Sequence, residues 1–141
     1  MDFPSVFRPR QKGLGKIFGH LECDIMDCVW DKGSASVKDV YEVLHVKKGI
    51  AYTTVMTVTG RLAEKGLLNK HQSGNKYIYT PVYTKQELMD MVSKEVLTGL
   101  FADDRQPVLS NLVDAFEGLD REELELLRKE IDKVIDDKNG D

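Results

Sequence analysis

Threonine is unusually frequent in one short segment of the chain, where its side chains could read the edges of DNA bases. The pattern predicts a helix over about 51–65, within the stretch IAYTTVMTVTGRLAEKGLL that begins at Ile50. Threonine is a mediocre helix former, and a helix that only faced water would more often carry Glu, Lys or Gln. Its hydroxyl can donate or accept a hydrogen bond, however, and its methyl can pack against the methyl of thymine.

Helical spacing divides this segment into an apolar face and a polar face. The apolar stripe consists of Val55, Val58 and Leu62, with Met56 and Thr59 at its margins, and the opposite face of Thr53, Thr54, Thr57 and Arg61. Tyr52, at the helix start, could reach a phosphate oxygen, and Lys65 near the end could meet the DNA backbone or a base edge. The alternative is that these threonines only cap the helix and pack.

Two helices are expected before this segment and a β-ribbon after it. Residues 19–32 have amphipathic helical spacing, and the next helix is expected to begin after Ser36, with Asp39 completing a near capping box. Gly66 is the stop signal of the threonine-rich helix. The letters SGN, flanked by polar and aromatic runs, predict a hairpin between two short strands. Three helices followed by a two-stranded ribbon are typical of a winged helix-turn-helix.

Beyond Thr84 the pattern is entirely helical. We expect helices over about 85–101, from Pro107 to about 118, and from the cap Asp120 to about 138. Three short helices give a thin core, so we interpret this part as a dimerisation element; the alternative is that it packs on its own first domain. The residues expected at the dimer interface are Val96, Leu100, Leu109, Leu112, Val113, Phe116, Leu124, Leu127, Ile131 and Val134.

The predicted fold is therefore mainly α with a small β-ribbon, a winged helix-turn-helix domain followed by a helical dimerisation domain. The expected parts are an arm or tail at 1–16, a DNA-binding domain at 17–84 and a three-helix domain at 85–141. Charge follows this division: residues 1–84 hold 12 Lys and Arg against 8 Asp and Glu, whereas residues 85–141 hold 8 against 16. A net charge of +4 beside −8 favours a nucleic-acid module, although two solvated surfaces of accidental sign would look the same.

Several classes of function are excluded or made improbable by what the sequence lacks. It has no apolar run long enough to span a membrane, no signal-peptide pattern, no phosphate-binding loop, no HExxH and no nucleophile elbow, so we expect no enzyme. Cys23 and Cys28 are five residues apart on one helix, about 140° apart around its axis, which disfavours a disulfide and favours a cytoplasmic setting. His20 and Cys23 share a face, but two ligands do not complete a site, and we expect no metal and no cofactor.

Four stretches in order resemble the penicillinase-repressor family, the BlaI, MecI and CopY group of bacterial transcription repressors. They are LECDIMDCVW, SVKDVYEVL, AYTTVMTVTGRLAEKGLL and KYIYTPV, and the likeness covers about residues 17–137. The resemblance implies a homodimer that binds double-stranded DNA at an inverted-repeat operator and blocks transcription. By position it implies base contacts from Thr54 and Thr57, with Thr53, Met56 and Arg61 beside them. The expected backbone contacts are Tyr52, Lys65, Lys70, Ser73, Asn75 and Lys76.

The chain also departs from its apparent relatives. The copper-responsive branch of the family has paired C-x-C ligands near the C-terminus, and this chain has no cysteine after Cys28. The antibiotic-responsive branch is released by cleavage at an Asn-Phe bond; here the stretch EVLTGLFADD keeps Phe101 without that dipeptide. The family resemblance nevertheless implies a sensor protease as a partner, with cleavage near residues 97–102. Arg8 and Arg10 could form an arm in the minor groove, or the segment could be a tail.

Two rival functions remain open at this level. The chain could be a winged-helix module that binds proteins and not DNA, or a regulator with an effector pocket between its domains. The net charge of −4 for the whole chain leaves room for the first rival.

Overall fold

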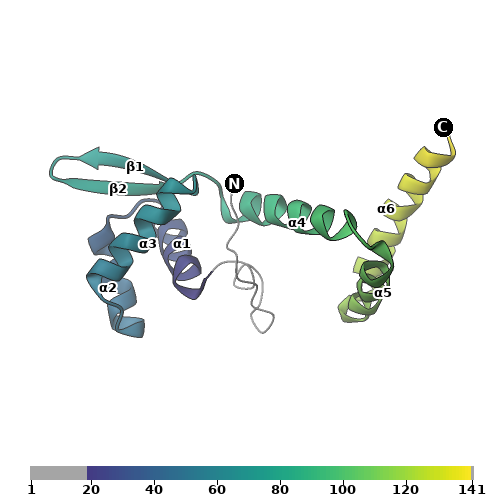
Figure 1. Ribbon diagram of the computed structural model, residues 1–141, viewed down its shortest axis with the longest axis horizontal. Coiled ribbons are helices and arrows are strands. Elements are labelled where there is room, and N and C mark those ends of the chain that lie inside the picture. The colour runs from purple at the N-terminus through teal and green to yellow at the C-terminus, as the bar shows by residue number, and fades with distance from the viewer. Residues whose placement is uncertain (1–18, 141) are drawn as a thin grey trace. The chain divides into compact units, whose positions relative to one another are not determined.

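The computed structural model describes residues 19–140, and the predicted N-terminal arm, with Arg8 and Arg10, lies outside them. Three helices, a two-stranded antiparallel ribbon and three further helices follow one another in these residues (Figure 1). The elements are α1 (His20–Lys32), α2 (Val37–Lys48), α3 (Tyr52–Glu64), β1 (Leu68–Ser73), β2 (Lys76–Pro81), α4 (Lys85–Phe101), α5 (Arg105–Ala115) and α6 (Arg121–Asn139). The predicted fold class is confirmed.

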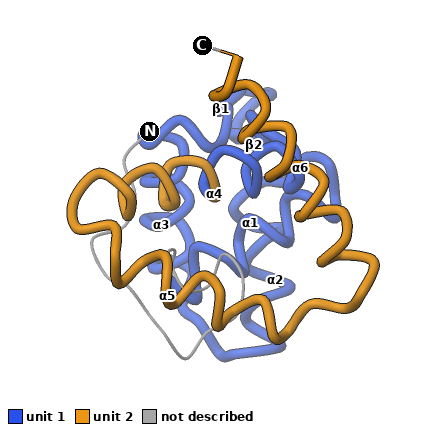
Figure 2. The backbone as a smooth tube through the Cα atoms, turned by 90° about the vertical axis from the view of Figure 1, so that its right-hand side faces the viewer, with its two compact units in different colours: residues 1–92 blue, residues 93–141 orange. Residues whose placement is uncertain are grey.

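Contacts divide the chain after Val92 into an N-terminal unit and a C-terminal unit, which Figure 2 colours blue and orange. This division lies inside α4, further along the chain than the boundary expected at Thr84. The reason is that Leu88 and Val92, 1% and 2% exposed, belong to the hydrophobic core of the N-terminal unit. The first turns of α4 therefore complete the winged-helix domain.

Local signals fix most helix ends. The Ser36 hydroxyl accepts from the Asp39 amide at 3.1 Å, and the Ser36 amide donates to the Asp39 carboxylate at 2.9 Å, so the expected capping box is formed. Donation by that amide is the main reason why the pKa of Asp39 is lowered from its ordinary value. Gly66 follows α3 at a φ of +81°, a conformation that side chains other than glycine rarely adopt. The helix expected to run to 118 instead ends at Ala115, and a short 3₁₀ turn follows it.

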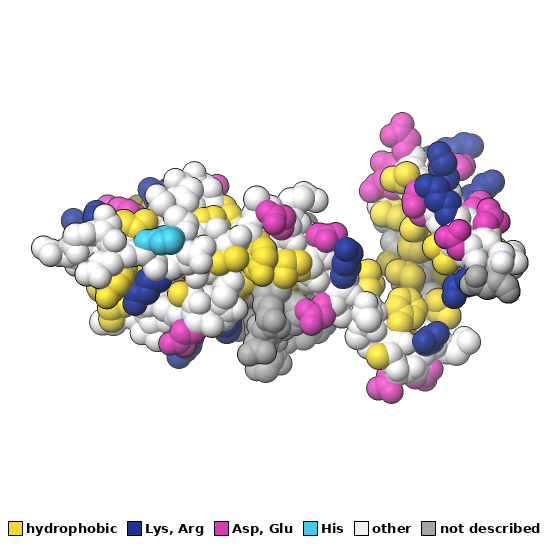
Figure 3. Space-filling view, turned by 90° about the horizontal axis from the view of Figure 1, so that it is seen from above, with side chains coloured by type: hydrophobic (Ala, Val, Ile, Leu, Met, Phe, Trp, Pro, Cys, Tyr) yellow, Lys and Arg dark blue, Asp and Glu magenta, His cyan; other side chains and the backbone are white. Residues whose placement is uncertain are grey.

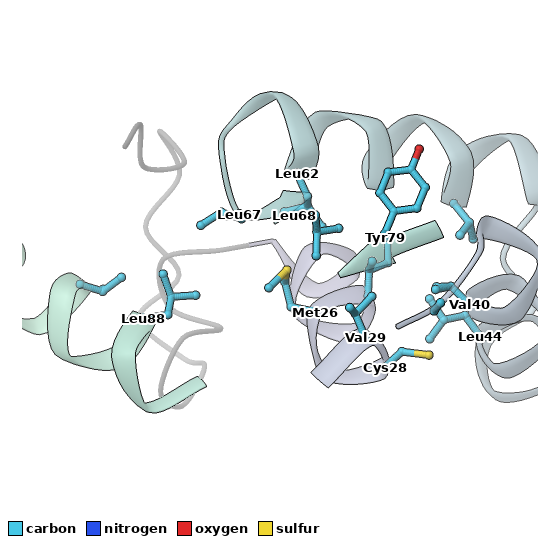
Figure 4. Packing of buried hydrophobic residues seen from close by; sticks show 14 residues of the cluster. Met26, Cys28, Val29, Val40, Leu44, Leu62, Leu67, Leu68, Tyr79 and Leu88 are labelled. Atoms are coloured by element: carbon cyan, nitrogen blue, oxygen red, sulfur yellow. The ribbon is translucent and has the colours of Figure 1, made fainter. Parts of the chain in front are cut away.

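The core of the N-terminal unit gathers side chains from every one of its elements. In Figure 4, Met26 of α1 lies below Leu62 of α3, and Val29 of α1 lies between Met26 and the buried Val40 and Leu44 of α2. Ile25, Val29, Val40, Val55 and Leu62 are 0% exposed. Burial of each such side chain contributes about 1.5–3 kcal/mol, so this core fixes the orientation of α3.

The ribbon is a tight hairpin that is tied back to the helices. Its register pairs Leu68 with Pro81 and Ser73 with Lys76, which leaves a two-residue turn at the predicted SGN site. Ala35 and Tyr79 exchange backbone hydrogen bonds of 3.0 and 2.8 Å. The base of the ribbon is thereby held beside the start of α2, and its turn projects away from the helices (Figure 1).

Thr59 is a core residue, although the sequence pattern put it at the margin of the apolar stripe. Its side chain is 0% exposed, and its hydroxyl has no hydrogen-bond partner among the described residues. A buried hydroxyl without a partner costs about 1–3 kcal/mol.

Replacing Thr59 by valine should therefore raise the free energy of unfolding by about 1 kcal/mol, because valine has the same shape without the hydroxyl. The measurement is urea unfolding followed by circular dichroism. Thr98→Val, at an exposed position of α4, is the matched control and should bring no gain. A loss of stability in Thr59→Val would show that the hydroxyl is hydrogen-bonded in the native protein.

Candidate nucleic-acid interface

The start of α3 presents a short polar surface that nothing in its own unit covers. Ala51 is the N-cap and forms no side-chain hydrogen bond, so the first amides of α3 have no side-chain cap. Thr53 and Thr54 are exposed, whereas the next residue, Val55, is 0% exposed. An uncapped helix start carries partial positive charge and unpaired donors, both of which favour a nearby anion such as phosphate.

The same face continues for a second turn. Thr57 and Arg61 are exposed, as the sequence predicts, and Met56 is 47% exposed. The Thr57 hydroxyl donates to the backbone carbonyl of Thr53 at 2.9 Å. The five residues expected to contact bases therefore all face outward from α3.

Tyr52 is held at the edge of this surface by another aromatic ring. Its ring meets that of Tyr41 edge-on, with centroids 5.4 Å apart, and Tyr41 in turn lies 5.0 Å from His45. Tyr52 remains 44% exposed. Such contacts restrict the ring and leave the phenol hydroxyl available as a hydrogen-bond donor, which suits the phosphate contact expected of Tyr52.

The ribbon adds a second set of polar groups. Lys70, Ser73, Asn75 and Lys76 are all exposed, and the Lys70 ammonium lies 4.1 Å from the centre of the Tyr77 ring. Sequence reasoning missed Tyr77. The signal was available in the hairpin register, because Gln72 opposes Tyr77 and Lys70 is therefore its diagonal neighbour on the same face. The aromatic ring restrains Lys70, a residue expected to touch the DNA backbone.

Lys65 differs from the other expected contact residues. Its ammonium lies 3.5 Å from a carboxylate oxygen of Glu22 on α1, and the two side chains are only 26% and 18% exposed. This ion pair joins the end of α3 to α1. The structure therefore gives Lys65 a contact inside its own unit, and the expected contact of Lys65 with DNA stays a prediction.

The cysteines and histidines do not form a metal centre in the described residues. No group of three or more His, Cys, Asp or Glu side chains in 19–140 is arranged to hold an ion, and both cysteines are free. Burial, with nearby carboxylates led by Asp27 and Asp24, raises the pKa of Cys23 to about 11. With its pKa raised in this way, the thiol of Cys23 is mainly protonated at neutral pH and is a weak nucleophile.

The C-terminal unit presents a different surface, which is largely apolar. None of its described residues, 93–140, is buried. Leu112, Phe116 and Leu127 are half-buried, and the other seven side chains expected at the dimer interface are exposed, Val113 at 63% and Val134 at 54%. Figure 3 shows apolar side chains as a continuous yellow band on this unit, with charged side chains along its borders. An apolar band of this kind is typical of a protein–protein interface.

Sequence comparisons with known proteins identify a family. Residues 18–133 match the sequence model of the family described as Penicillinase repressor. The transcriptional regulator BlaI of Mycobacterium tuberculosis is 33% identical over 112 residues, which cover 79% of this chain and 80% of that protein. The penicillinase repressor of Staphylococcus aureus is 26% identical over 107 residues, covering 76% of this chain and 84% of that protein.

Solved structures of similar proteins include the monomeric form of Bacillus licheniformis BlaI in complex with the blaP half-operator. It is 27% identical with a TM-score of 0.44, and the match covers 50% of this chain and 85% of that one. No helix within residues 19–140 is long and apolar enough to cross a membrane.

Proposed function

The chain belongs to the penicillinase-repressor family and is a DNA-binding transcriptional repressor, and from this premise we propose that it acts as a homodimer on an inverted-repeat operator. In this proposal α3 enters the major groove, and the β1–β2 ribbon, the wing, contacts the DNA backbone. The observation that carries it is the outward face of α3, where exposed threonines replace the charged residues of an ordinary solvent-facing helix.

The geometry favours DNA over a protein partner for this face. A helix that docks on protein would present an apolar stripe, but Thr53, Thr54, Thr57 and Arg61 are polar and only Met56 is apolar. Lys70 and Lys76 add exposed positive charge on the wing, where phosphate contacts are expected. A protein-interaction module without DNA binding remains the rival that experiments must exclude.

The homodimer is supported by the C-terminal unit considered alone. Because none of the residues 93–140 is buried, these helices lack a core of their own, and a second copy offers the same apolar band. In a two-fold dimer, two copies of α3 would read the two halves of an inverted repeat.

The expected protease partner forms the last part of the proposal. Residues 97–101 are helical and end α4, with Leu97 and Leu100 exposed and Phe101 half-buried. Cleavage there would separate the DNA-binding unit from most of the C-terminal unit. Mass spectrometry on repressor from antibiotic-treated cells would reveal a fragment that ends between 97 and 102.

The test of the proposal as a whole is fluorescence anisotropy on DNA from the region upstream of the protein's own gene, against scrambled DNA of equal length. A preference of about a thousandfold or more, with two protomers on each site, would support an operator-bound dimer. Weak binding that is equal on both duplexes would favour the protein-interaction module.

Base reading by α3 predicts a sequence-dependent loss. Thr54→Ala and Thr57→Ala should each weaken operator binding by about 1–3 kcal/mol and weaken binding to scrambled DNA much less, because each change removes a contact to a base edge. The measurement is the ratio of the two dissociation constants. An equal loss on both duplexes would mean that these residues contact only the backbone.

Backbone contact by the wing predicts the opposite pattern. Lys70→Ala should weaken binding to operator and scrambled DNA alike. It should also reduce the slope of log affinity against log salt concentration by the share of about one phosphate contact for each protomer. The matched control is Lys133→Ala, since Lys133 is an exposed lysine of α6 outside the proposed interface. If the salt slope of Lys70→Ala equals that of the wild type, the wing does not touch phosphate.

A further inference from the structure

The Thr57 hydroxyl is already engaged within α3, which restricts what Thr57 can offer to DNA. Its donated hydrogen bond to the Thr53 carbonyl is 2.9 Å long, the ordinary length for a strong bond between two oxygens. Among the described residues, neither Thr53 nor Thr54 forms a side-chain hydrogen bond, so their hydroxyls keep their protons available. The three exposed threonines of this face are therefore not chemically equivalent.

The hydrogen bond sets the direction of the two groups on the branched β-carbon. The hydroxyl oxygen points back along α3 towards the preceding turn, so the methyl group points away from that carbonyl. A hydroxyl whose proton is used cannot donate to O6 or N7 of guanine. What Thr57 presents outward is mainly a methyl group, on a face of the helix that is otherwise hydroxyl-rich and charged.

Gly60, one turn further along α3, leaves the space beside this methyl open. Glycine in the middle of a helix costs about 0.5–1 kcal/mol relative to alanine. The fold of the described residues gives no reason for it, because a Cβ at Gly60 would meet none of their atoms within 4 Å, and its φ is not positive. Without a side chain at 60, a base edge can come close to α3 next to Thr57.

We infer that Thr57 is a specificity-determining residue that recognises the C5-methyl group of a thymine by apolar contact, and not a hydrogen-bonding group of a base. Thymine is the only DNA base that carries a methyl group in the major groove, so this contact favours one base pair at that position. The inference rests on the proposed function, because it needs α3 in the major groove.

Deoxyuridine provides the test, because it differs from thymidine in DNA only by lacking the C5-methyl group. The full-length protein first selects a preferred duplex from a random-sequence pool, and each thymine of that duplex is then replaced singly by deoxyuridine. Wild-type binding should weaken about fourfold at one thymine, or at one symmetric pair, the factor that corresponds to about one methyl group removed from contact.

Two variants separate the methyl group from the hydroxyl. Thr57→Val keeps the methyl and should lose much less affinity than Thr57→Ser. The serine variant keeps the hydroxyl but removes the methyl from both protomers, so it should bind about 16-fold more weakly, about fourfold for each half-site. On a duplex with deoxyuridine at the sensitive position of both half-sites, Thr57→Ser should lose nothing further, because the methyl groups of Thr57 and of thymine form one contact in each half-site. Thr98→Ser, the same chemical change outside the interface, should behave as wild type throughout.

The possible failures are distinguishable. If selection yields no preferred sequence, the proposed function fails and the inference fails with it. If a preferred sequence emerges but no thymine is sensitive to loss of its methyl group, only the inference is overturned. A loss of binding in Thr57→Val with normal binding in Thr57→Ser would overturn it as well, since the hydroxyl would then make the contact.

Discussion

Replacement of Leu62 by alanine is expected to lower the free energy of unfolding of the N-terminal unit by about 2–5 kcal/mol. Leu62 is 0% exposed and packs where α3 meets α1 and β1. Alanine would leave a cavity among closely packed neighbours. The free-energy cost of this cavity adds to the hydrophobic free energy that is lost when the leucine side chain is removed. Since small domains are stable by only about 5–15 kcal/mol, a large part of the unit's stability would be lost.

The chain offers a convenient probe for this measurement. Trp30 is the only tryptophan, and its indole nitrogen donates to the backbone carbonyl of Tyr83 at 2.9 Å, so its fluorescence reports unfolding of the N-terminal unit. Urea unfolding should show a lower midpoint with an unchanged slope. Val46→Ala is the control, because Val46 is apolar but 84% exposed, and it should change stability by less than about 0.5 kcal/mol. A loss below about 1 kcal/mol in Leu62→Ala would contradict the central place of Leu62 in the core.

The second large effect is expected at the proposed dimer interface. Leu127→Glu would place a carboxylate in the apolar band of the C-terminal unit, where a second copy would have to bury it without a partner charge. We expect the variant to be monomeric in analytical ultracentrifugation. Its operator affinity should fall by about 10²–10⁴-fold, the usual gain from linking two binding sites.

The adjacent leucine provides the control. Leu126 is 63% exposed and lies away from the stripe of Leu124, Leu127, Ile131 and Val134, on the charged side of α6. Leu126→Glu should remain dimeric and bind DNA as wild type does. If both variants stay dimeric, the apolar band is not the interface. A monomeric wild-type protein would instead favour packing of the C-terminal helices on their own first domain.

Short-range patterns in the sequence were sufficient for most of the fold. The capping box at Ser36 and Asp39, the stop at Gly66 and the hairpin turn depend on residues that are neighbours in the chain, so their types and spacing predict them. The outward face of α3 also followed from helical spacing, and all five expected base-contact residues are exposed. Whether those residues touch bases stays a prediction.

The features that sequence reasoning missed depend on contacts between distant residues. The Glu22–Lys65 ion pair joins residues 43 positions apart, and nothing near Lys65 in the chain indicates that its charge is engaged. Burial of Thr59 depends on how α3 is rotated about its axis against the other helices. Helical spacing shows which side of α3 is apolar, but it does not show which residues at the margin of that side are buried. The core extends to Val92 because α4 begins by packing on the N-terminal unit, and helical periodicity alone carries no sign of such a boundary.

The absence of any buried residue among 93–140 has a consequence for gene regulation. If these helices complete their core only by pairing, their folding is a second-order process, and the melting temperature of this unit rises with protein concentration. The concentration of repressor in a cell then sets the fraction of repressor molecules whose C-terminal unit is folded. When the cellular concentration of the repressor is halved, the concentration of the dimer falls by more than half, so occupancy of the operator responds to repressor concentration more steeply than it would for a monomer.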